Sequence, residues 1–225
     1  MRFLIDTFSP EAAKHILDYY PADGVTTNPA IICREKKPLK PTLMELREAV
    51  GDKMLHVQTM QTEADAMLDE ALSLRDALSG CRFFVKLPCN PEGIKACRAI
   101  KSKGVGVTVT AVFSPMQALV AARAGADFVA PYVNKLEDVG EGLRCVKEIK
   151  ELFDIHALPT QILSASFRNV RQVTEVALFG SHYATLPPAF FDKLVYHPMT
   201  ENAVKGFEDD WQELYGDKKP IDLIK

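Results

Sequence analysis

The 225-residue sequence predicts an α/β fold, namely a (β/α)₈ barrel of the TIM type with an additional C-terminal helix. Short, almost continuous apolar runs alternate with longer amphipathic stretches, and polar residues gather where the apolar runs end. Continuous apolar runs suit parallel strands that are covered on both faces. Their regular alternation with helices favours one closed barrel over an open sheet.

The apolar runs predict eight strands. They cover residues 2–5, 24–26, 55–58, 82–87, 105–110, 128–130, 158–162 and 183–186. The chain is near the short end for this architecture, which typically has ~250 residues, so little length is left for insertions.

The intervening stretches predict helices whose ends carry recognisable signals. Ser9 is a suitable N-cap with Pro10 in the first turn. Gly104 and Gly125 suit the position that follows a helix C-terminus. The short basic segment 36–40 is expected to be a solvated loop. The expected helices cover residues 10–19, 62–78, 91–103, 115–124, 137–153 and 169–178.

One further amphipathic helix is expected at residues 201–215, beyond the eighth strand and its helix. No Gly/Ser-rich linker divides the chain, so residues 1–225 are expected to form a single domain. The extra helix then packs either on its own barrel or on a neighbouring subunit. Its apolar side chains are Val204, Phe207, Trp211 and Leu214.

Composition and motifs exclude several classes of function. A formal net charge of -3 gives no electrostatic basis for binding nucleic acid or a membrane surface, and no stretch approaches the ~20 apolar residues that span a bilayer. No signal-peptide pattern is present, and five cysteines without a C-x-x-C pair indicate reduced thiols, so a cytoplasmic protein is expected. The histidines lack H-x-H and H-E-x-x-H spacing, and no glycine-rich nucleotide loop follows a strand, so neither a metal nor an organic cofactor is expected.

Polar residues stand at the C-terminal end of nearly every expected strand. These ends converge at one mouth of a barrel, where the active sites of this architecture lie, so we expect a single polar site there. Buried polar groups need partners, which makes such placement seldom accidental. The residues are Asp6, Thr26, Asn28, Gln58, Lys86, Thr108, Thr110, Tyr132, Asn134, Ser164 and Ser166.

Lys86 is the most informative of them because it lies within an apolar strand. Desolvation lowers the pKa of a buried lysine, and a neutral amine attacks carbonyl carbons to form a Schiff base. Asp6 would face the same mouth and could transfer the proton of a substrate hydroxyl. The simpler alternatives are a buried ion pair for Lys86 and a helix N-cap for Asp6, although Ser9 is better placed to cap.

Five motifs together resemble the transaldolase superfamily, and specifically its short branch that contains fructose-6-phosphate aldolase. The resemblance covers essentially the whole chain, and T-T-N-P followed by V-K-L-P is a specific combination, whereas each motif alone is weak. The motifs are LIDT (residues 4–7), GVTTNP (24–29), FVKLP (84–88), APYVN (130–134) and ASFR (165–168).

The resemblance implies a role for most of these polar residues. Lys86 corresponds to the Schiff-base lysine and Asp6 to the acid/base carboxylate. Ser166 and Arg168 match the Ser-x-Arg that holds the substrate phosphate, a task that suits the two parallel donors of a guanidinium. The other substrate-binding positions are Thr26, Asn28, Thr108, Thr110, Asn134 and Lys135.

Two positions favour an aldolase over a transaldolase. Transaldolases of this family have a glutamate on the third strand that activates a catalytic water, whereas this chain has Gln58, which cannot accept a proton. The short-branch aldolases pair that glutamine with a tyrosine on the sixth strand, here Tyr132. Two departures are Lys135, where the family usually has arginine, and Thr108, where many transaldolases have asparagine.

The expected function is therefore a metal-independent class I aldolase that interconverts fructose 6-phosphate with dihydroxyacetone and glyceraldehyde 3-phosphate. A transaldolase and a non-catalytic sugar-phosphate-binding barrel are the alternatives, and a phosphosugar isomerase is a weaker one because no paired Glu/His arrangement is evident. The resemblance also implies ketose and aldose phosphates as ligands and a homo-oligomer, either a pentamer or a decamer, in which the C-terminal helix reaches a neighbour.

Overall fold

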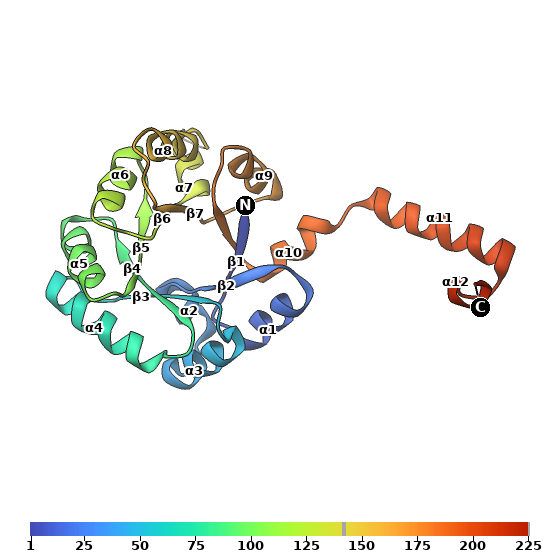
Figure 1. Ribbon diagram of the computed structural model, residues 1–225, viewed down its shortest axis with the longest axis horizontal. Coiled ribbons are helices and arrows are strands. Elements are labelled where there is room, and N and C mark those ends of the chain that lie inside the picture. Colours follow the sequence, from blue (N-terminus) through green and yellow to red (C-terminus); the bar gives the residue numbers. More distant parts are fainter. Residues whose placement is uncertain (141–142, 225) are drawn as a thin grey trace. The chain divides into compact units, whose positions relative to one another are not determined.

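The computed structural model describes residues 1–140 and 143–224. Over this part of the chain, eight parallel strands close into a barrel in sequence order, with the helices outside them (Figure 1). The strands are β1 (Arg2–Asp6), β2 (Ala22–Thr26), β3 (Met54–Gln58), β4 (Arg82–Pro88), β5 (Gly106–Val112), β6 (Phe128–Pro131), β7 (Gln161–Ser164) and β8 (Tyr183–Leu186). The predicted fold class is confirmed.

The residues that the sequence predicted at helix ends are confirmed in these positions. The Ser9 hydroxyl accepts the Ala12 backbone N–H at 3.2 Å, and Gly104 and Gly125 adopt positive φ angles after their helices. The helices of the barrel are α1 (Pro10–Tyr19), α2 (Pro29–Glu35), α3 (Leu39–Val50), α4 (Ala64–Ala77), α5 (Pro91–Ser102), α6 (Pro115–Arg123), α7 (Val133–Asp138), α8 (Arg144–Ile155) and α9 (Val170–Leu178). The helix α10 (Pro188–Val195) follows β8 along the chain.

Three expected boundaries were wrong. The helix expected at 137–153 is interrupted, because α7 ends at Asp138 and Gly140 adopts the left-handed conformation at φ +81° before α8 begins; residues 141–142 of that expected helix lie outside the described residues. The seventh strand begins at Gln161 rather than at residue 158. The expected loop at 36–40 ends earlier, since α3 already starts at Leu39 after Pro38, and α2 and α3 were both unforeseen.

The chain divides into two compact units, Met1–Phe190 and Phe191–Lys225. In the second unit, the expected helix at 201–215 is confirmed as α11 (Pro198–Tyr215), which starts earlier because Pro198 occupies its first turn, and α12 (Pro220–Leu223) follows it. The Trp211 indole donates a hydrogen bond to the Lys218 carbonyl oxygen at 2.7 Å. The surface on which α11 packs stays a prediction.

The barrel interior and its outer layer contain different apolar residues, and this alternation orients the strand that bears Lys86. Phe84 packs with the interior residues, which include Leu4, Met54, Phe128, Leu163 and Tyr183. Val85 and Leu87 belong instead to the larger cluster between strands and helices. Successive side chains of a strand point to opposite faces, so Lys86 points into the barrel with Phe84.

Gly24 allows β2 to lie close against β3, and we expect Gly24→Ala to destabilise the barrel by about 2–4 kcal/mol. Its φ of +151° disfavours any side chain, and an added Cβ would lie 2.1 Å from the Met54 carbonyl oxygen. Urea unfolding measures the change. Gly104→Ala is the control, since Gly104 has φ +73° after the end of its helix but open space around it, so it should lose only roughly 1 kcal/mol. Equal losses would contradict the steric part of this explanation.

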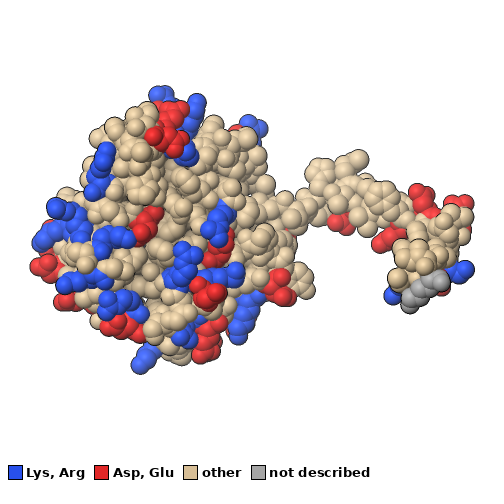
Figure 2. Space-filling view, in the orientation of Figure 1, with Lys and Arg blue, Asp and Glu red and all other residues tan. Residues whose placement is uncertain are grey.

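No helix among the described residues is long and apolar enough to cross a membrane. On the face of the barrel unit that Figure 2 shows, basic and acidic side chains are interspersed.

Candidate active site

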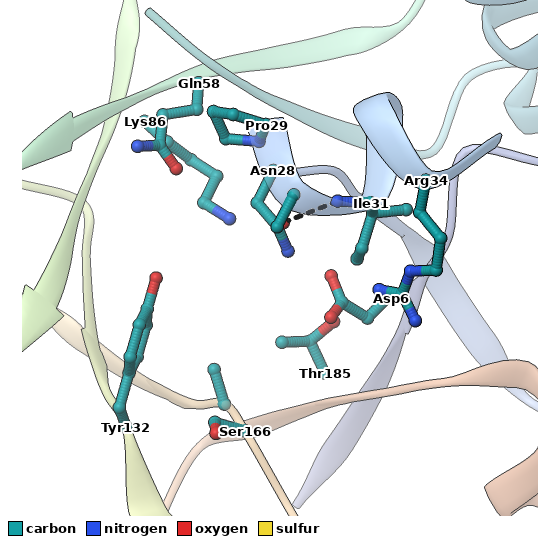
Figure 3. Close-up of a pocket in the computed structure, with 12 residues that line it drawn as sticks. Asp6, Asn28, Pro29, Ile31, Arg34, Gln58, Lys86, Tyr132, Ser166 and Thr185 are labelled. Carbon is teal, nitrogen blue, oxygen red and sulfur yellow. Dashed lines mark hydrogen bonds between the residues drawn. The ribbon is translucent and has the colours of Figure 1, made fainter. Parts of the chain in front are cut away.

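A cavity of about 470 Å³ is lined by half of the residues to which the sequence assigned a catalytic or binding role. Figure 3 shows its side chains, which come from the C-terminal ends of the strands and from α2. Six of the predicted site residues line it, namely Asp6, Asn28, Gln58, Lys86, Tyr132 and Ser166. The remaining lining residues are Pro29, Ala30, Ile31, Arg34, Ala165 and Thr185.

Lys86 is a buried amine with its nitrogen at this cavity. The residue is 5% exposed, and its Nζ donates a hydrogen bond to the Thr27 carbonyl oxygen at 2.7 Å. Burial lowers the pKa of Lys86, and the negative charge of Asp6 opposes this shift only in part. A lowered pKa increases the fraction of neutral amine, which is the nucleophilic form.

Asp6 shares the cavity with Lys86, and its pKa is shifted in the opposite direction. Burial raises the pKa of this carboxyl group, while Lys86 and a hydrogen bond from Thr26 act to lower it. The Thr26 hydroxyl donates to Asp6 Oδ1 at 2.8 Å and lies 2.6 Å from the Thr185 hydroxyl. Because the single proton of Thr26 goes to Asp6, Thr185 must donate to Thr26. This chain of hydrogen bonds from Thr185 through Thr26 holds the carboxyl group of Asp6 in a position suited to proton transfer.

Asn28 has its side chain oriented by a helix cap. Its Oδ1 accepts the Ile31 backbone N–H at 3.0 Å at the start of α2 (Figure 3). The capping bond assigns the oxygen, so the amide NH₂ is the group left for the cavity. Asn28 can therefore donate hydrogen bonds to substrate hydroxyl groups.

Tyr132 stands across the cavity from Asp6 in Figure 3. Its hydroxyl lies 3.1 Å from the Thr110 hydroxyl, and its ring is packed edge-on against Phe113 with centroids 5.6 Å apart. Among the described residues, Gln58 has no hydrogen-bond partner for its side chain, so its amide can bind a water molecule or a substrate group.

Ser166 enters the cavity from a strained backbone. Its φ of +63° lies in the left-handed region, which costs a residue with a side chain of order 1–3 kcal/mol. Two backbone hydrogen bonds hold it, from Val133 N–H to the Ala165 carbonyl at 2.9 Å and from Asn134 N–H to the Ser166 carbonyl at 2.8 Å. The start of α7 thus fixes the conformation that brings Ser166 to the site.

The other predicted site residues lie behind or outside the cavity lining. Thr26 and Thr110 support Asp6 and Tyr132, respectively, through the hydrogen bonds given above. Thr108 is fully buried and lies 2.9 Å from Nδ1 of His56, whose pKa is lowered well below its usual value by burial. The substrate-binding roles of these threonines stay predictions.

Besides these three threonines, three further residues that the sequence assigned to substrate binding are not among those that line the cavity. Asn134 donates weakly to Asp138 at 3.5 Å, and its Oδ1 is buried without a partner among the described residues. Lys135 is exposed on α7. Arg168 is 66% exposed and pairs with Asp138 at 3.3 Å. A phosphate role for Lys135 and Arg168 therefore stays a prediction that these positions do not by themselves support.

Sequence reasoning missed three contributors. Thr185 is the penultimate residue of β8 and could have been found by the same strand-end pattern as the other polar residues. The Thr27 carbonyl is a backbone group, for which a sequence carries no signal. Arg34 lies on α2, which was not foreseen, so its place at the cavity could not be inferred.

The described residues contain no group of three or more His, Cys, Asp or Glu side chains placed to hold a metal ion. What the cavity does hold is a buried amine of lowered pKa, a carboxyl group of raised pKa and a tyrosine hydroxyl. This set can perform carbonyl chemistry through a Schiff base with proton transfer on two sides.

Residues 3–218 match a family model described as Transaldolase/Fructose-6-phosphate aldolase. A probable transaldolase of Symbiobacterium thermophilum is 36% identical over 217 residues, which cover 96% of this chain and 99% of the relative. A probable transaldolase of Nitrosopumilus maritimus is 37% identical over 226 residues, covering 99% and 100%. One of Aquifex aeolicus is 38% identical over 215 residues, covering 95% and 98%.

Solved structures agree on the fold. The native KDPGal structure superposes with a TM-score of 0.56 at 16% identity, covering 82% of this chain and 80% of the other. A mandelate oxidase variant with an FMN adduct gives a TM-score of 0.55 at 13% identity over 83% of this chain, which spans only 63% of that protein. Identities this low establish a shared architecture alone.

Proposed function

Because the chain belongs to the transaldolase/fructose-6-phosphate aldolase family, we propose that it is a class I aldolase that interconverts fructose 6-phosphate with dihydroxyacetone and glyceraldehyde 3-phosphate. An enzyme of the aldolase/transaldolase type follows from the family itself. The observation that carries the finer proposal is the presence of Gln58 and Tyr132, rather than a second carboxylate, beside Lys86 in the cavity.

In the proposed mechanism, neutral Lys86 attacks C2 of the ketose, and loss of water gives the iminium ion. Asp6 takes the proton of the C4 hydroxyl as the C3–C4 bond breaks, and the bonding electrons pass into the iminium to form an enamine. Glyceraldehyde 3-phosphate leaves as the aldehyde. Tyr132, with a water held by Gln58, then protonates C3, and hydrolysis of the iminium releases dihydroxyacetone and restores the amine. Asn28 holds substrate hydroxyls throughout.

The transaldolase alternative is favoured by the names of the relatives, which are called probable transaldolases. Release of free dihydroxyacetone from fructose 6-phosphate, with and without erythrose 4-phosphate, separates the two. An aldolase releases dihydroxyacetone without an acceptor. A transaldolase retains the enamine until the acceptor arrives, so a strict requirement for erythrose 4-phosphate would overturn the aldolase proposal.

Tyr132→Phe is expected to slow dihydroxyacetone release by about 10²- to 10³-fold, because general acid–base groups contribute on this scale. Transfer to erythrose 4-phosphate should fall much less, because it does not require protonation of the enamine carbon. Both products are measured from the same reaction. Tyr183→Phe is the matched control, since the Tyr183 hydroxyl accepts a hydrogen bond from Arg2 at the N-terminal ends of β1 and β8, away from the cavity. Equal losses in the two reactions would argue against this role of Tyr132.

We also propose that the protein is a cytoplasmic homo-oligomer that uses α11 at a contact between subunits. All five cysteines are free thiols, which supports a reducing compartment. Val204, Phe207 and Leu214 of α11 are exposed, and apolar groups in such number commonly mark a contact surface. Light scattering on the intact chain measures the number of subunits.

A further inference from the structure

His56 and Thr108 form a hydrogen-bonded pair in the interior of the barrel, and the reaction proposed above gives this pair no role. Nδ1 of His56 lies 2.9 Å from the Thr108 hydroxyl, and both residues are fully buried. The His56 ring stacks on Phe84 with centroids 4.6 Å apart and an interplanar angle of 16°. Neither residue of the pair is among those that line the cavity, so the pair is not part of the cavity wall.

The register of the strands places this pair directly below the layer that contains Lys86. The interior of such a barrel is filled by layers of four side chains, and alternate strands contribute to one layer. The odd-numbered strands contribute one layer, which contains Leu4, His56, Thr108 and Leu163. The even-numbered strands contribute the next layer toward the cavity, which contains Thr26, Lys86, Ala130 and Thr185. The hydrogen bonds within each layer, His56 with Thr108 and Thr26 with Thr185, agree with this assignment.

A polar pair is less stable in this layer than an apolar pair would be. Nε2 of His56 is buried and has no hydrogen-bond partner among the described residues. A buried polar atom without a partner lowers the free energy of unfolding. Leu4 and Leu163 fill the other half of the layer with apolar side chains. Packing alone therefore does not account for His56 and Thr108, which points to a role in the chemistry of the layer above them.

The proton of the Thr108 hydroxyl is directed to His56. Thr108 makes no other side-chain hydrogen bond within the described part of the chain. Burial and, to a smaller extent, the positive charges of Lys86 and Arg82 lower the pKa of His56 well below its usual value, so the ring is neutral and one of its nitrogens accepts. Thr108 therefore donates to Nδ1, and the lone pairs of its oxygen are left on the side away from His56. Lys86 lies on that side, since it is the neighbour of Thr108 in the register of β4 and β5.

The Lys86 side chain is held above His56 through Thr27. Nζ of Lys86 donates to the Thr27 carbonyl oxygen at 2.7 Å. The Thr27 backbone N–H and hydroxyl both donate to the His56 carbonyl oxygen, at 2.9 and 3.1 Å. The lysine side chain thus runs from β4 toward the end of β2 and crosses above β3, which bears His56. The titratable groups that face the amine are Asp6 on β1, His56 on β3, and Tyr132 and Arg34 across the cavity.

We propose that His56 is a positioning residue, which holds the Thr108 hydroxyl with its oxygen toward Lys86, and that this oriented dipole stabilises the positive charge of the iminium ion. A fixed dipole in a dry interior stabilises a charge without having to reorient when the charge forms. This inference rests on the proposed function, because it needs an iminium ion on Lys86, and it holds for an aldolase and a transaldolase alike.

Two variants remove the pair and nearly preserve its shape, because His56→Phe keeps an aromatic ring and Thr108→Val replaces the hydroxyl by a methyl group. Each should slow the formation of reduced adduct on Lys86, with fructose 6-phosphate and borohydride, by about 5- to 30-fold, since one oriented dipole next to a charge contributes on the scale of a hydrogen bond. The double variant should lose no more than the larger single loss, because the two residues act as one unit. Thr108→Ser keeps the hydroxyl and should stay within about threefold of the wild type.

The pH profile distinguishes this role from a structural one. The dipole stabilises the charged amine as well as the iminium ion, so its removal lowers the pKa of Lys86. The acid limb of kcat/KM should therefore move to lower pH in His56→Phe and in Thr108→Val. Leu163→Val is the matched control, because it changes the packing of the same layer but removes no dipole, and its acid limb should stay in place. An acid limb that stays in place in both variants of the pair would overturn the proposal.

A substrate analogue separates this role from direct substrate binding by Thr108. Glucitol 6-phosphate has no ketone and cannot form an imine, so it measures noncovalent binding alone. Thr108→Val should bind it as tightly as the wild type does. A loss of affinity that matches the loss of adduct formation would overturn the proposal, because Thr108 would then bind the substrate itself.

The wild-type protein separates failure of this inference from failure of the proposed function. If it forms no adduct on Lys86, the Schiff-base function fails, and the inference fails with it. If it forms the adduct and His56→Phe forms the adduct at the same rate, only the role of His56 is overturned.

Discussion

Lys86→Met is expected to lower the turnover of fructose 6-phosphate by at least about 10⁴-fold, the scale on which enzymes respond to the loss of a nucleophile. Methionine is nearly as long as lysine, being one atom shorter, and suits the apolar strand around it, but it has no amine with which to form an iminium. Borohydride with fructose 6-phosphate should attach a reduced adduct to Lys86 in the wild-type protein and none in the variant. Peptide mass spectrometry locates the adduct.

The same variant tests the non-catalytic alternative. A sugar-phosphate-binding barrel would keep nearly all its affinity in Lys86→Met and would show no turnover in the wild-type protein. Lys103→Met is the matched control, because Lys103 is exposed at the end of α5 and should be dispensable. Turnover that survives in Lys86→Met within about tenfold of the wild type would contradict the Schiff-base mechanism.

Lys86 could be predicted from the sequence because the physical signal is local. A lysine flanked by Phe84, Val85 and Leu87 belongs to a buried strand, and alternation along that strand then fixes the face it occupies. The strand-end pattern found Asp6 and Tyr132 for the same reason. In a closed parallel barrel, all strand ends meet at one mouth whatever the details of packing, so knowledge of the fold class was enough to bring them together.

Arg34, Lys135 and Arg168 show which site residues could not be predicted from the positions of strand ends. Whether a helical side chain reaches the cavity depends on the orientation of the helix. The helix α2 has seven residues, none of which is buried, so its sequence lacks the amphipathic pattern that would predict it. Arg168 was assigned to the site because residues 165–168 resemble the Ser-x-Arg motif that holds the substrate phosphate in the family. Its pairing with Asp138 on α7 joins residues that are 30 positions apart, and the sequence carries no local signal for such a contact.

Asp6→Asn is expected to reduce kcat by about 10²- to 10⁴-fold, the usual contribution of a general acid–base group. Asparagine has nearly the same shape and can still accept the hydrogen bond from Thr26, but it cannot take the hydroxyl proton. Imine formation precedes that proton transfer, so Lys86 of the variant should still be trapped by borohydride. Asp154→Asn, on the surface of α8, is the control with unchanged kcat.

The pH profile of Asp6→Asn gives a second and independent readout. The negative charge of Asp6 raises the pKa of Lys86, against the larger lowering by burial. Removing that charge lets the pKa of Lys86 fall further, so the amine stays neutral to a lower pH. The acid limb of kcat/KM, which reports protonation of Lys86 in the free enzyme, should therefore move to lower pH even though the rate is reduced. An acid limb that disappears would assign the limb to Asp6 itself, and one that moves to higher pH would mean that Asp6 does not stabilise the charged amine.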